Sequence, residues 1–134
     1  MRHFFIGALL VWSSLFGANL DWSSNYEAAK VKAKANGKLV YVLITSDDCR
    51  WCRKFETTTL KNDKILKRLY SEFEVVHISR DKHKVPAAFE TSPVPRHYFT
   101  DAKGNITYSS LGHRGLECFE SFMDNAQSKT KTTK

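Results

Sequence analysis

Two cysteines separated by two residues are the part of this sequence best suited to chemistry. Cys49 and Cys52 lie within the segment SDDCRWCRKFE, directly after an apolar run and at the start of an amphipathic helical pattern. If a helix begins near Cys49, its geometry places the two Cα atoms about 5 Å apart, within the range that a disulfide bridges. The pair is therefore expected to form a disulfide that opens and closes without refolding the chain.

The position at the start of a helix gives the two thiols different roles. Unpaired backbone N–H groups and the helix dipole stabilise a thiolate there, and lower a cysteine pKa from ~8.5 to between ~3.5 and 7.5. Cys49 is therefore predicted to attack a substrate disulfide, and Cys52, one turn deeper, to resolve the mixed disulfide. Arg50 adds positive charge that favours the reduced pair, whereas the two aspartates before Cys49 oppose it. Trp51 is expected either to offer an apolar flank to the partner or to cover an edge of the core.

A metal site is a second use of such a pair, because Cys49, Cys52 and a histidine are possible ligands of zinc or copper. The sequence has no second Cys-x-x-Cys, and its histidines show no close pairing at metal-ligand spacing. His97 is the best candidate for a third ligand, and a competing expectation is that alternation along its strand points it to solvent. We expect no metal and no other cofactor, with a Cys/His metal-binding module as the alternative of a different class.

Local patterns predict the elements that position the pair. Residues 24–27, Ser-Asn-Tyr-Glu, fit a capping box at the start of a helix that ends at Asn36-Gly37. Residues 39–44 form a continuous β-prone run, as expected of a strand in the sheet interior. The helix of the cysteine pair is predicted to run to about residue 60, and Asn62 or Asp63 caps another that ends near residue 70.

The second half of the chain predicts the rest of a sheet and a last helix. Residues 73–79 are predicted to be a second central strand and 85–90 a short helical turn, and residues 101–105 join strands 96–100 and 106–110 as a hairpin. After Gly112 and Gly115, apolar positions 116, 119, 122 and 123 recur at helical spacing and predict a last helix. Within it, Cys118 is predicted to pack at the edge of the core rather than serve as a regulatory thiol. Strands interleaved with helices predict an α/β fold with a mixed sheet between helices.

The length and composition suit one domain. The chain has 134 residues, of which 42% are apolar and 13% aromatic. Residues 1–18 are predicted to be a signal peptide, because a basic start, an apolar stretch at 4–16 and small residues at 17 and 18 follow each other. The apolar stretch is too short to span a bilayer of about 30 Å, and an uncleaved anchor is the alternative. Residues 19–127 are then the domain and 128–134 a flexible basic tail, and the protein is predicted to be periplasmic, with no stable membrane insertion once the signal is removed.

The excess of basic over acidic residues does not predict nucleic-acid binding. The chain has a net charge of +7, and removal of Arg2 with the signal leaves 20 Lys and Arg against 14 Asp and Glu, or +6. The lysines are dispersed along helices and gather in the tail, without the interleaved aromatic residues that stack on bases. Solvated helix faces and a frayed tail account for the charge.

The order of elements, with Cys-x-x-Cys after the first central strand and Val94-Pro95 before the hairpin, resembles the thioredoxin-like family over about residues 21–126. The segment around the cysteines is similar to that of exported or periplasmic thioredoxin-related proteins. The resemblance implies a three-layer sandwich with a mixed central sheet, and thiol:disulfide oxidoreductase activity. It also implies that Pro95 is cis and faces the cysteine pair, and that Val94 offers its backbone to an extended substrate segment. Pro93 is a competing position for the cis bond, and a trans turn is the simpler alternative.

The chain departs from the family pattern beside the pair. Typical thioredoxins carry a Trp immediately before the first cysteine and a buried Asp six residues before it, where this chain has Asp48 and Leu43. Glu56 lies on the same helical face as the cysteines and is a candidate replacement as proton acceptor. A matching Glu occurs in the related C-terminal thioredoxin-like domain of the transmembrane electron transporter that supplies reducing power to the periplasm. The alternative is an exposed acid paired with Lys54 or Lys61.

The resemblance also implies a direction and a set of partners. Similarity to the reductive periplasmic group implies reduction of disulfides in exported proteins and recharging by a membrane electron-donor protein. Arg50, Trp51, Val94 and Pro95 would contact the substrate. The same chemistry in reverse makes a disulfide oxidase or isomerase, and the reduction potential decides between them.

Overall fold

The computed structural model describes residues 21–131, so the predicted signal peptide lies outside the described residues. The elements in chain order are α1 (Tyr26–Asn36), β1 (Leu39–Thr45), α2 (Arg50–Thr57), the short 3-10 helix η1 (Thr59–Lys61), α3 (Asp63–Glu72), β2 (Phe73–Ser79), β3 (Arg96–Thr100), β4 (Ile106–Leu111) and α4 (Leu116–Lys131). This order confirms the predicted series except at residues 85–90, where the chain makes one hydrogen-bonded turn from Pro86 to Phe89 rather than a helical segment.

The four strands form one mixed sheet in the order β2-β1-β3-β4. β1 pairs with β2 in parallel and with β3 antiparallel, and β3 pairs with β4 antiparallel. The prediction of β1 in the interior is confirmed, but the prediction of β2 as a central strand is wrong. β2 lies at the sheet edge, where its outer side pairs with the incoming chain at a bridge between Ser23 and Val76.

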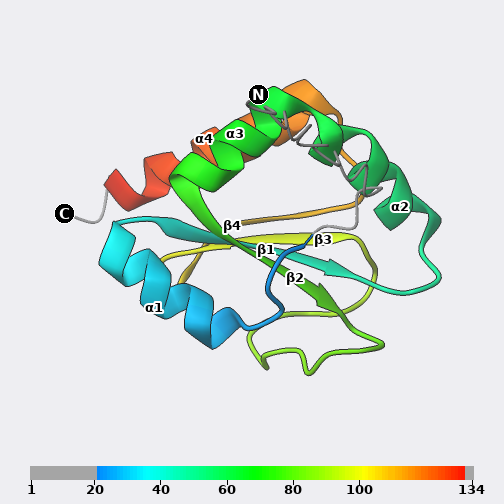
Figure 1. The fold of residues 1–134 in the computed structure, drawn as a ribbon, viewed down its shortest axis with the longest axis horizontal. Helices are drawn as coiled ribbons and strands as arrows, with labels where there is room; N and C mark the ends of the chain where they lie inside the picture. The colour runs from blue at the N-terminus through cyan, green and yellow to red at the C-terminus, as the bar shows by residue number, and fades with distance from the viewer. Residues whose placement is uncertain (1–20, 132–134) are drawn as a thin grey trace, which may run out of the picture.

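Helices cover both faces of the sheet, and the result is a three-layer α/β sandwich (Figure 1). All seven residues of β1 are buried. Its side chains alternate between two cores, because successive residues of a strand point to opposite faces. Leu39, Tyr41 and Leu43 pack with residues of α2, α3 and α4, whereas the even-numbered residues between 40 and 44 pack with α1. A strand with two buried faces needs a continuous apolar run, and residues 39–44 supply it.

The caps of α1 and the end of α2 differ in detail from the sequence expectation. Asn25, not Ser24, caps α1, since its side chain accepts a hydrogen bond from the N–H of Ala28 at 3.0 Å. At the other end, Gly37 adopts the left-handed conformation with φ of 65°, as predicted. α2 stops at Thr57, three residues early, because the Thr57 and Thr58 hydroxyls donate to carbonyls of the preceding turn and the chain tightens into η1.

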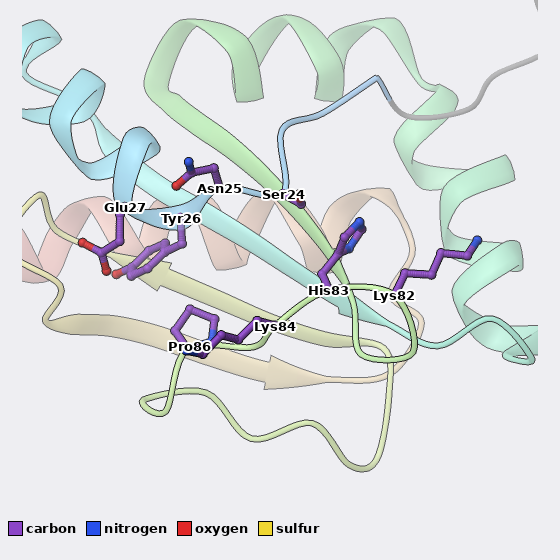
Figure 2. Close-up of a pocket in the computed structure, with 8 residues that line it drawn as sticks. All are labelled: Ser24, Asn25, Tyr26, Glu27, Lys82, His83, Lys84 and Pro86. Carbon is purple, nitrogen blue, oxygen red and sulfur yellow. The ribbon is translucent and has the colours of Figure 1, made fainter.

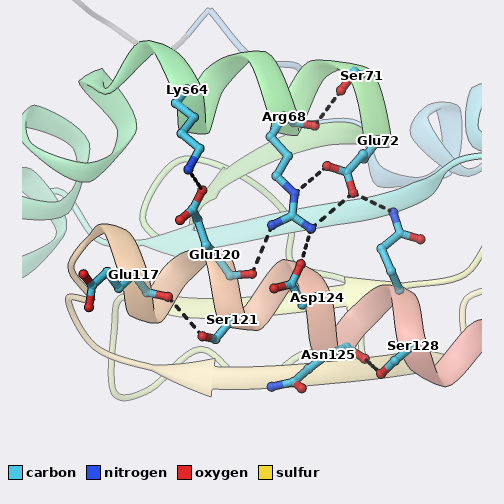
Figure 3. A network of polar contacts seen from close by, with 11 residues as sticks. Lys64, Arg68, Ser71, Glu72, Glu117, Glu120, Ser121, Asp124, Asn125 and Ser128 are labelled. Atoms are coloured by element: carbon cyan, nitrogen blue, oxygen red, sulfur yellow. Dashed lines mark hydrogen bonds and ion pairs between the residues drawn. The ribbon is translucent and has the colours of Figure 1, made fainter.

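An arginine joins α3 to α4 on the side of the sheet that carries the cysteine pair (Figure 3). Arg68 pairs with Glu72 on its own helix and with Asp124 of α4, and it donates to the Glu120 carbonyl at 3.3 Å. This contact and the buried residues Phe119, Phe122, Met123 and Ala126 dock α4 on the sheet. α4 runs to Lys131, so the first residues of the predicted tail are helical.

Candidate functional site

The cysteine pair occupies the first turn of α2. Cys49 and Cys52 are joined by a disulfide with Cα atoms 5.2 Å apart, close to the separation expected from helix geometry. Cys49 is the N-cap, and its sulfur accepts a hydrogen bond from the N–H of Cys52 at 3.1 Å. Cys49 is 8% exposed and Cys52 only 2%. The first cysteine is therefore the more accessible of the two.

On the outer side, Trp51 stands beside the pair as an exposed aromatic surface. It is 49% exposed, so it does not cover the core. The Arg50 guanidinium and the Lys54 ammonium lie over the indole, 5.5 and 5.1 Å from the ring centroid. The ring of His113 stacks with the Trp51 indole, and the two ring centroids are 6.2 Å apart. Trp51 thus forms an apolar platform with a cationic border.

The chain before β3 reaches the same end of the sheet as the cysteine loop. Ile44, near the end of β1, pairs with Arg96 at the start of β3, so the 92–95 segment enters the sheet where β1 leads to Cys49. Both the Ser92–Pro93 and Val94–Pro95 peptide bonds are cis, so both candidate positions carry one. Pro95 is buried, and its carbonyl accepts from Gly112 N–H at 2.8 Å.

On the inner side, Cys52 borders a polar pocket of about 340 Å³ that also contains Glu56 and His77. His77 Nε2 lies 2.8 Å from the Thr45 hydroxyl and 3.5 Å from Glu56 Oε1. The Glu56 side chain is 24% exposed, and the side chain it approaches is that of His77 rather than Lys54 or Lys61, so the alternative of an exposed acid paired with a lysine does not hold.

Burial favours the neutral forms of both Glu56 and His77 in this pocket. Burial raises the pKa of Glu56, and the charge of Arg53 only partly offsets it. Burial also lowers the pKa of His77, and the positive charges of His83 and Lys82 lower it further. A carboxyl group with a raised pKa and a neutral imidazole are the groups that proton transfer near pH 7 requires.

His97 is neither solvent-directed nor free to bind a metal. It is fully buried, and its Nδ1 lies 2.7 Å from the Tyr41 hydroxyl while its Nε2 lies 2.8 Å from the Gly112 carbonyl. A carbonyl only accepts, so Nε2 carries the proton and Nδ1 accepts from Tyr41. Burial lowers the pKa of His97 to about 4. The expectation of a solvent-facing strand position is wrong because both faces of β3 are covered at this point.

Three residues of the site were not predicted from the sequence: Thr45, His77 and His113. A register argument would have found His77, because it is the β2 partner of Leu43, the position where typical thioredoxins carry their acid. His113 gave no sequence signal, since it lies in an irregular loop. The hydroxyl of Thr59 ties that loop down by donating to the Arg114 carbonyl at 2.6 Å.

The prediction for Cys118 is wrong. Its thiol is exposed, and Leu116 in the same turn is 44% exposed. The buried face of α4 begins only at Phe119, because the first turn of the helix projects past the core. Cys118 therefore plays no part in the packing that its neighbours suggested.

Another pocket lies away from the disulfide. It measures about 630 Å³, and its lining residues come from the start of α1 and from the 82–86 loop (Figure 2). Lys82 and His83 also border the pocket at Cys52, so this loop separates the two. Between residues 21 and 131, no three His, Cys, Asp or Glu side chains gather as a metal site would require, and no helix has the length and apolar character needed to cross a membrane.

Comparison with known proteins agrees with this geometry. Residues 21–102 match the family model described as Thioredoxin-like. The fold is similar to that of the oxidoreductase DsbH, with 20% identity and a TM-score of 0.66 over 82% of this chain and 86% of that one. It is similar to a thioredoxin from Thermus thermophilus, with 21% identity and a TM-score of 0.64 over 84% and 88%. It is also similar to the oxidised DsbD C-terminal domain from Neisseria meningitidis, with 17% identity and a TM-score of 0.57 over 73% and 90%.

These identities are low, so the structural likeness establishes the fold. No curated relative matches the chain in sequence. The family match, however, spans more than half of the chain and includes both cysteines. With a Cys49–Cys52 disulfide at Cys-x-x-Cys spacing on a thioredoxin fold, the chain belongs to the thioredoxin-like family and is a thiol:disulfide oxidoreductase.

Proposed function

We propose that the protein reduces disulfides in exported proteins. The observation that carries the proposal is the asymmetry of the pair: Cys49, at 8% exposure and next to the exposed Trp51, is more accessible than Cys52 at 2%. The direction rests on the resemblance of the segment around the cysteines to reductive periplasmic thioredoxin-related proteins. Export rests on the signal-like pattern of residues 1–18.

The reaction proceeds in two exchange steps from the reduced pair. The Cys49 thiolate attacks one sulfur of the substrate disulfide, which forms a mixed disulfide and releases the first substrate thiolate. Cys52 loses its proton and attacks the Cys49 sulfur, which breaks the mixed disulfide and releases the second substrate thiolate. Two electrons pass to the substrate, and the Cys49–Cys52 disulfide is left.

Glu56 and His77 are the proposed acceptors of the Cys52 proton. Both border the same pocket as Cys52. Leu43 occupies the position of the usual acid, and its β2 partner His77 approaches Glu56 to 3.5 Å. The pair would therefore replace the buried Asp of typical thioredoxins from the neighbouring strand and helix.

The substrate segment is proposed to lie along Val94. Neither the N–H nor the carbonyl of Val94 has a hydrogen-bond partner within residues 21–131, which leaves both available to an extended chain. Pro95 would support this edge, and Arg50 and Trp51 would contact the other side of the substrate. Substrates are protein disulfides, and a membrane electron-donor protein would return the pair to its reduced form.

The reverse reaction is the second candidate. The N–H of Cys52 donates to the Cys49 sulfur, and Arg50 lies next to it in sequence. Both stabilise a thiolate at Cys49, which favours the reduced pair and makes the couple more oxidising. These contacts favour an oxidase or isomerase, whereas the aspartates at 47 and 48 oppose the effect.

A trapping experiment tests the proposal. The Cys52→Ser variant is expected to accumulate mixed disulfides with exported proteins through Cys49, and a Cys49→Ser variant is the matched control. The wild-type protein is expected to reduce a disulfide-bonded test protein when supplied with a dithiol. A redox titration against glutathione gives the direction, since a potential well above that of glutathione supports the oxidase. Absence of trapped partners together with no turnover in either direction would overturn the proposal.

A further inference from the structure

A groove beside the cysteine pair is lined by basic residues and, within residues 21–131, by no acidic ones. It has a volume of about 410 Å³, lies between the end of α2, η1 and the start of α4, and is lined by Lys54, Lys61 and His113 among other residues. We propose that this cationic groove binds an acidic segment of the partner protein, next to the cysteine that the enzyme attacks. The inference rests on the proposed function, because it describes the substrate that the same site selects.

The charges of the groove are not neutralised by the chain itself. Neither Lys54 nor Lys61 forms an ion pair within residues 21–131, and no acidic residue lines the groove. The pocket on the other side of the disulfide differs, because Asp47 and Glu56 line it together with its cations. Acidic groups of a partner therefore gain most on the groove side.

Two residues of the groove connect it to the surface beside the cysteine pair. Lys54 lines it and also lies 5.1 Å from the centroid of the Trp51 ring, on which His113 stacks. Trp51 is two residues from Cys49, and Arg50 covers the same ring at 5.5 Å. A chain whose cysteine meets Cys49 would thus lay its neighbouring residues over Trp51 and into the groove.

The protonation of His113 should respond to an anion bound in the groove. Its Nδ1 is buried and has no hydrogen-bond partner among the described residues. Burial lowers the pKa of His113, and the charges of Lys54 and Arg114 lower it further. A carboxylate in the groove would offset these charges, so His113 should gain a proton more readily when the partner is bound.

The test measures how fast Cys49 reacts with peptides that differ only in charge. Three peptides carry one cysteine as a mixed disulfide with thionitrobenzoate, flanked by Glu, Gln or Lys residues. The protein carries Cys52→Ser and Cys118→Ser, so only Cys49 reacts. Its thiolate attacks the peptide sulfur and the coloured thionitrobenzoate leaves. The rate of each peptide with a small neutral thiol corrects for intrinsic reactivity.

The acidic peptide is expected to react about tenfold or more faster than the basic one at low salt, with the ratio falling toward one at about 1 M salt. Adding Lys54→Gln and Lys61→Gln should reduce the ratio about threefold or more. The matched control is Lys32→Gln with Lys34→Gln, two exposed lysines of α1 on the opposite face of the sheet with no ion pair within residues 21–131. It removes the same charge and should leave the ratio unchanged.

Equal rates for the three peptides, or equal losses in the groove and control variants, would overturn the inference and leave the proposed function intact. The failure of all three peptides to react would instead contradict Cys49 as the attacking thiol, and both proposals would fall. A second readout is the NMR titration of His113, whose pKa is expected to rise when the acidic peptide is added and to stay constant with the basic one.

Discussion

At the scale of single residues, the distinctive feature is a pair of groups proposed to replace a missing acid. Leu43 is fully buried where typical thioredoxins carry an Asp, and the nearby polar side chains are His77 on the neighbouring strand and Glu56 on α2. Both groups border Cys52 rather than Cys49. They are therefore placed to act on the second exchange step.

The Glu56→Gln variant tests this placement. We expect the attack of Cys49 on the substrate to keep its rate, and resolution by Cys52 to slow by about 10²-fold near pH 7, because an acceptor of its proton is lost. Rapid acid quenching followed by mass spectrometry would show the mixed disulfide accumulating. Glu117→Gln, an exposed acid at the start of α4, is the control and should behave as wild type. Resolution at the wild-type rate in Glu56→Gln would remove Glu56 from the mechanism.

His97 makes the protein sensitive to acid. Its pKa falls from 6.5 to about 4 on burial, so the folded state favours the neutral ring, and stability is lost as the pH falls from about 6.5 toward 4. Between pH 7 and 4.5 the wild-type protein should lose about 2–3 kcal/mol more of its free energy of unfolding than His97→Gln does. Urea denaturation at the two pH values measures this difference.

Tyr41→Phe is the control for that experiment. It removes the hydroxyl that donates to His97 but keeps the titrating ring, so it should lower stability by about 1 kcal/mol at pH 7 and retain the acid sensitivity. If His97→Gln and Tyr41→Phe lost the same stability on acidification, another group would be responsible.

At the scale of elements, the periodicity of the sequence predicts nearly every helix and strand, and the local ends are less certain. The bounds of β2 and β3 match their predicted residues, since turn residues or a helix end flank each apolar run. The cap of α1 does not match, because Ser24 and Asn25 are both good caps and only the path of the incoming chain decides between them. That path is set by the bridge from Ser23 to β2.

The two candidate caps make a matched pair of variants. Asn25→Ala should cost about 1 kcal/mol of stability, because the N–H of Ala28 loses its acceptor. Ser24→Ala should change stability by less than about 0.5 kcal/mol, as expected of an exposed site. Thermal and urea denaturation measure both, and a larger cost at Ser24 would restore the capping box that the sequence pattern suggests.

At the scale of the whole molecule, the three layers bring segments distant in sequence to one end of the sheet. Three segments meet there: the start of α2, the 92–95 segment and the 112–115 loop. They meet because β1 and β3 are antiparallel neighbours and because the N–H of Gly112 donates a hydrogen bond to the Pro95 carbonyl. The exposed cations are distributed unevenly around this end, with the groove on one side and mixed charges on the other. The molecule therefore presents one reactive sulfur between two different surfaces.

The predicted export concerns the whole chain and has a direct test. Expressed in a bacterium with its own N-terminal segment, the protein should be recovered from the periplasm starting at Asn19, after loss of residues 1–18. Cell fractionation and intact-mass measurement check this. A version with Leu9→Arg and Leu10→Arg, which interrupts the apolar stretch, should remain in the cytoplasm at full length. Recovery of the unprocessed chain in the membrane fraction would favour the uncleaved anchor.

The sequence by itself determined the chemistry and the class of fold. Cysteine spacing, the preceding apolar strand and the following helix are local features, and local geometry dictates that such thiols can bridge. Only the tertiary structure decided which groups lie beside the pair. His77 reaches Glu56 through the register of two parallel strands, and His113 reaches Trp51 through a loop held by Thr59.

The same reason explains the errors. The positions of Cys118 and His97 in their helix and strand were predicted correctly, but their exposure was not. Cys118 is exposed because the first turn of its helix projects past the core, and His97 is buried because its strand is covered on both faces. The disulfide predicted from the spacing of Cys49 and Cys52 is therefore confirmed. The surroundings of Glu56 and Trp51, and the cationic groove, are instead set by contacts between residues far apart in the chain. Periodicity records which face of an element is apolar, and the packing of whole elements decides what that face meets.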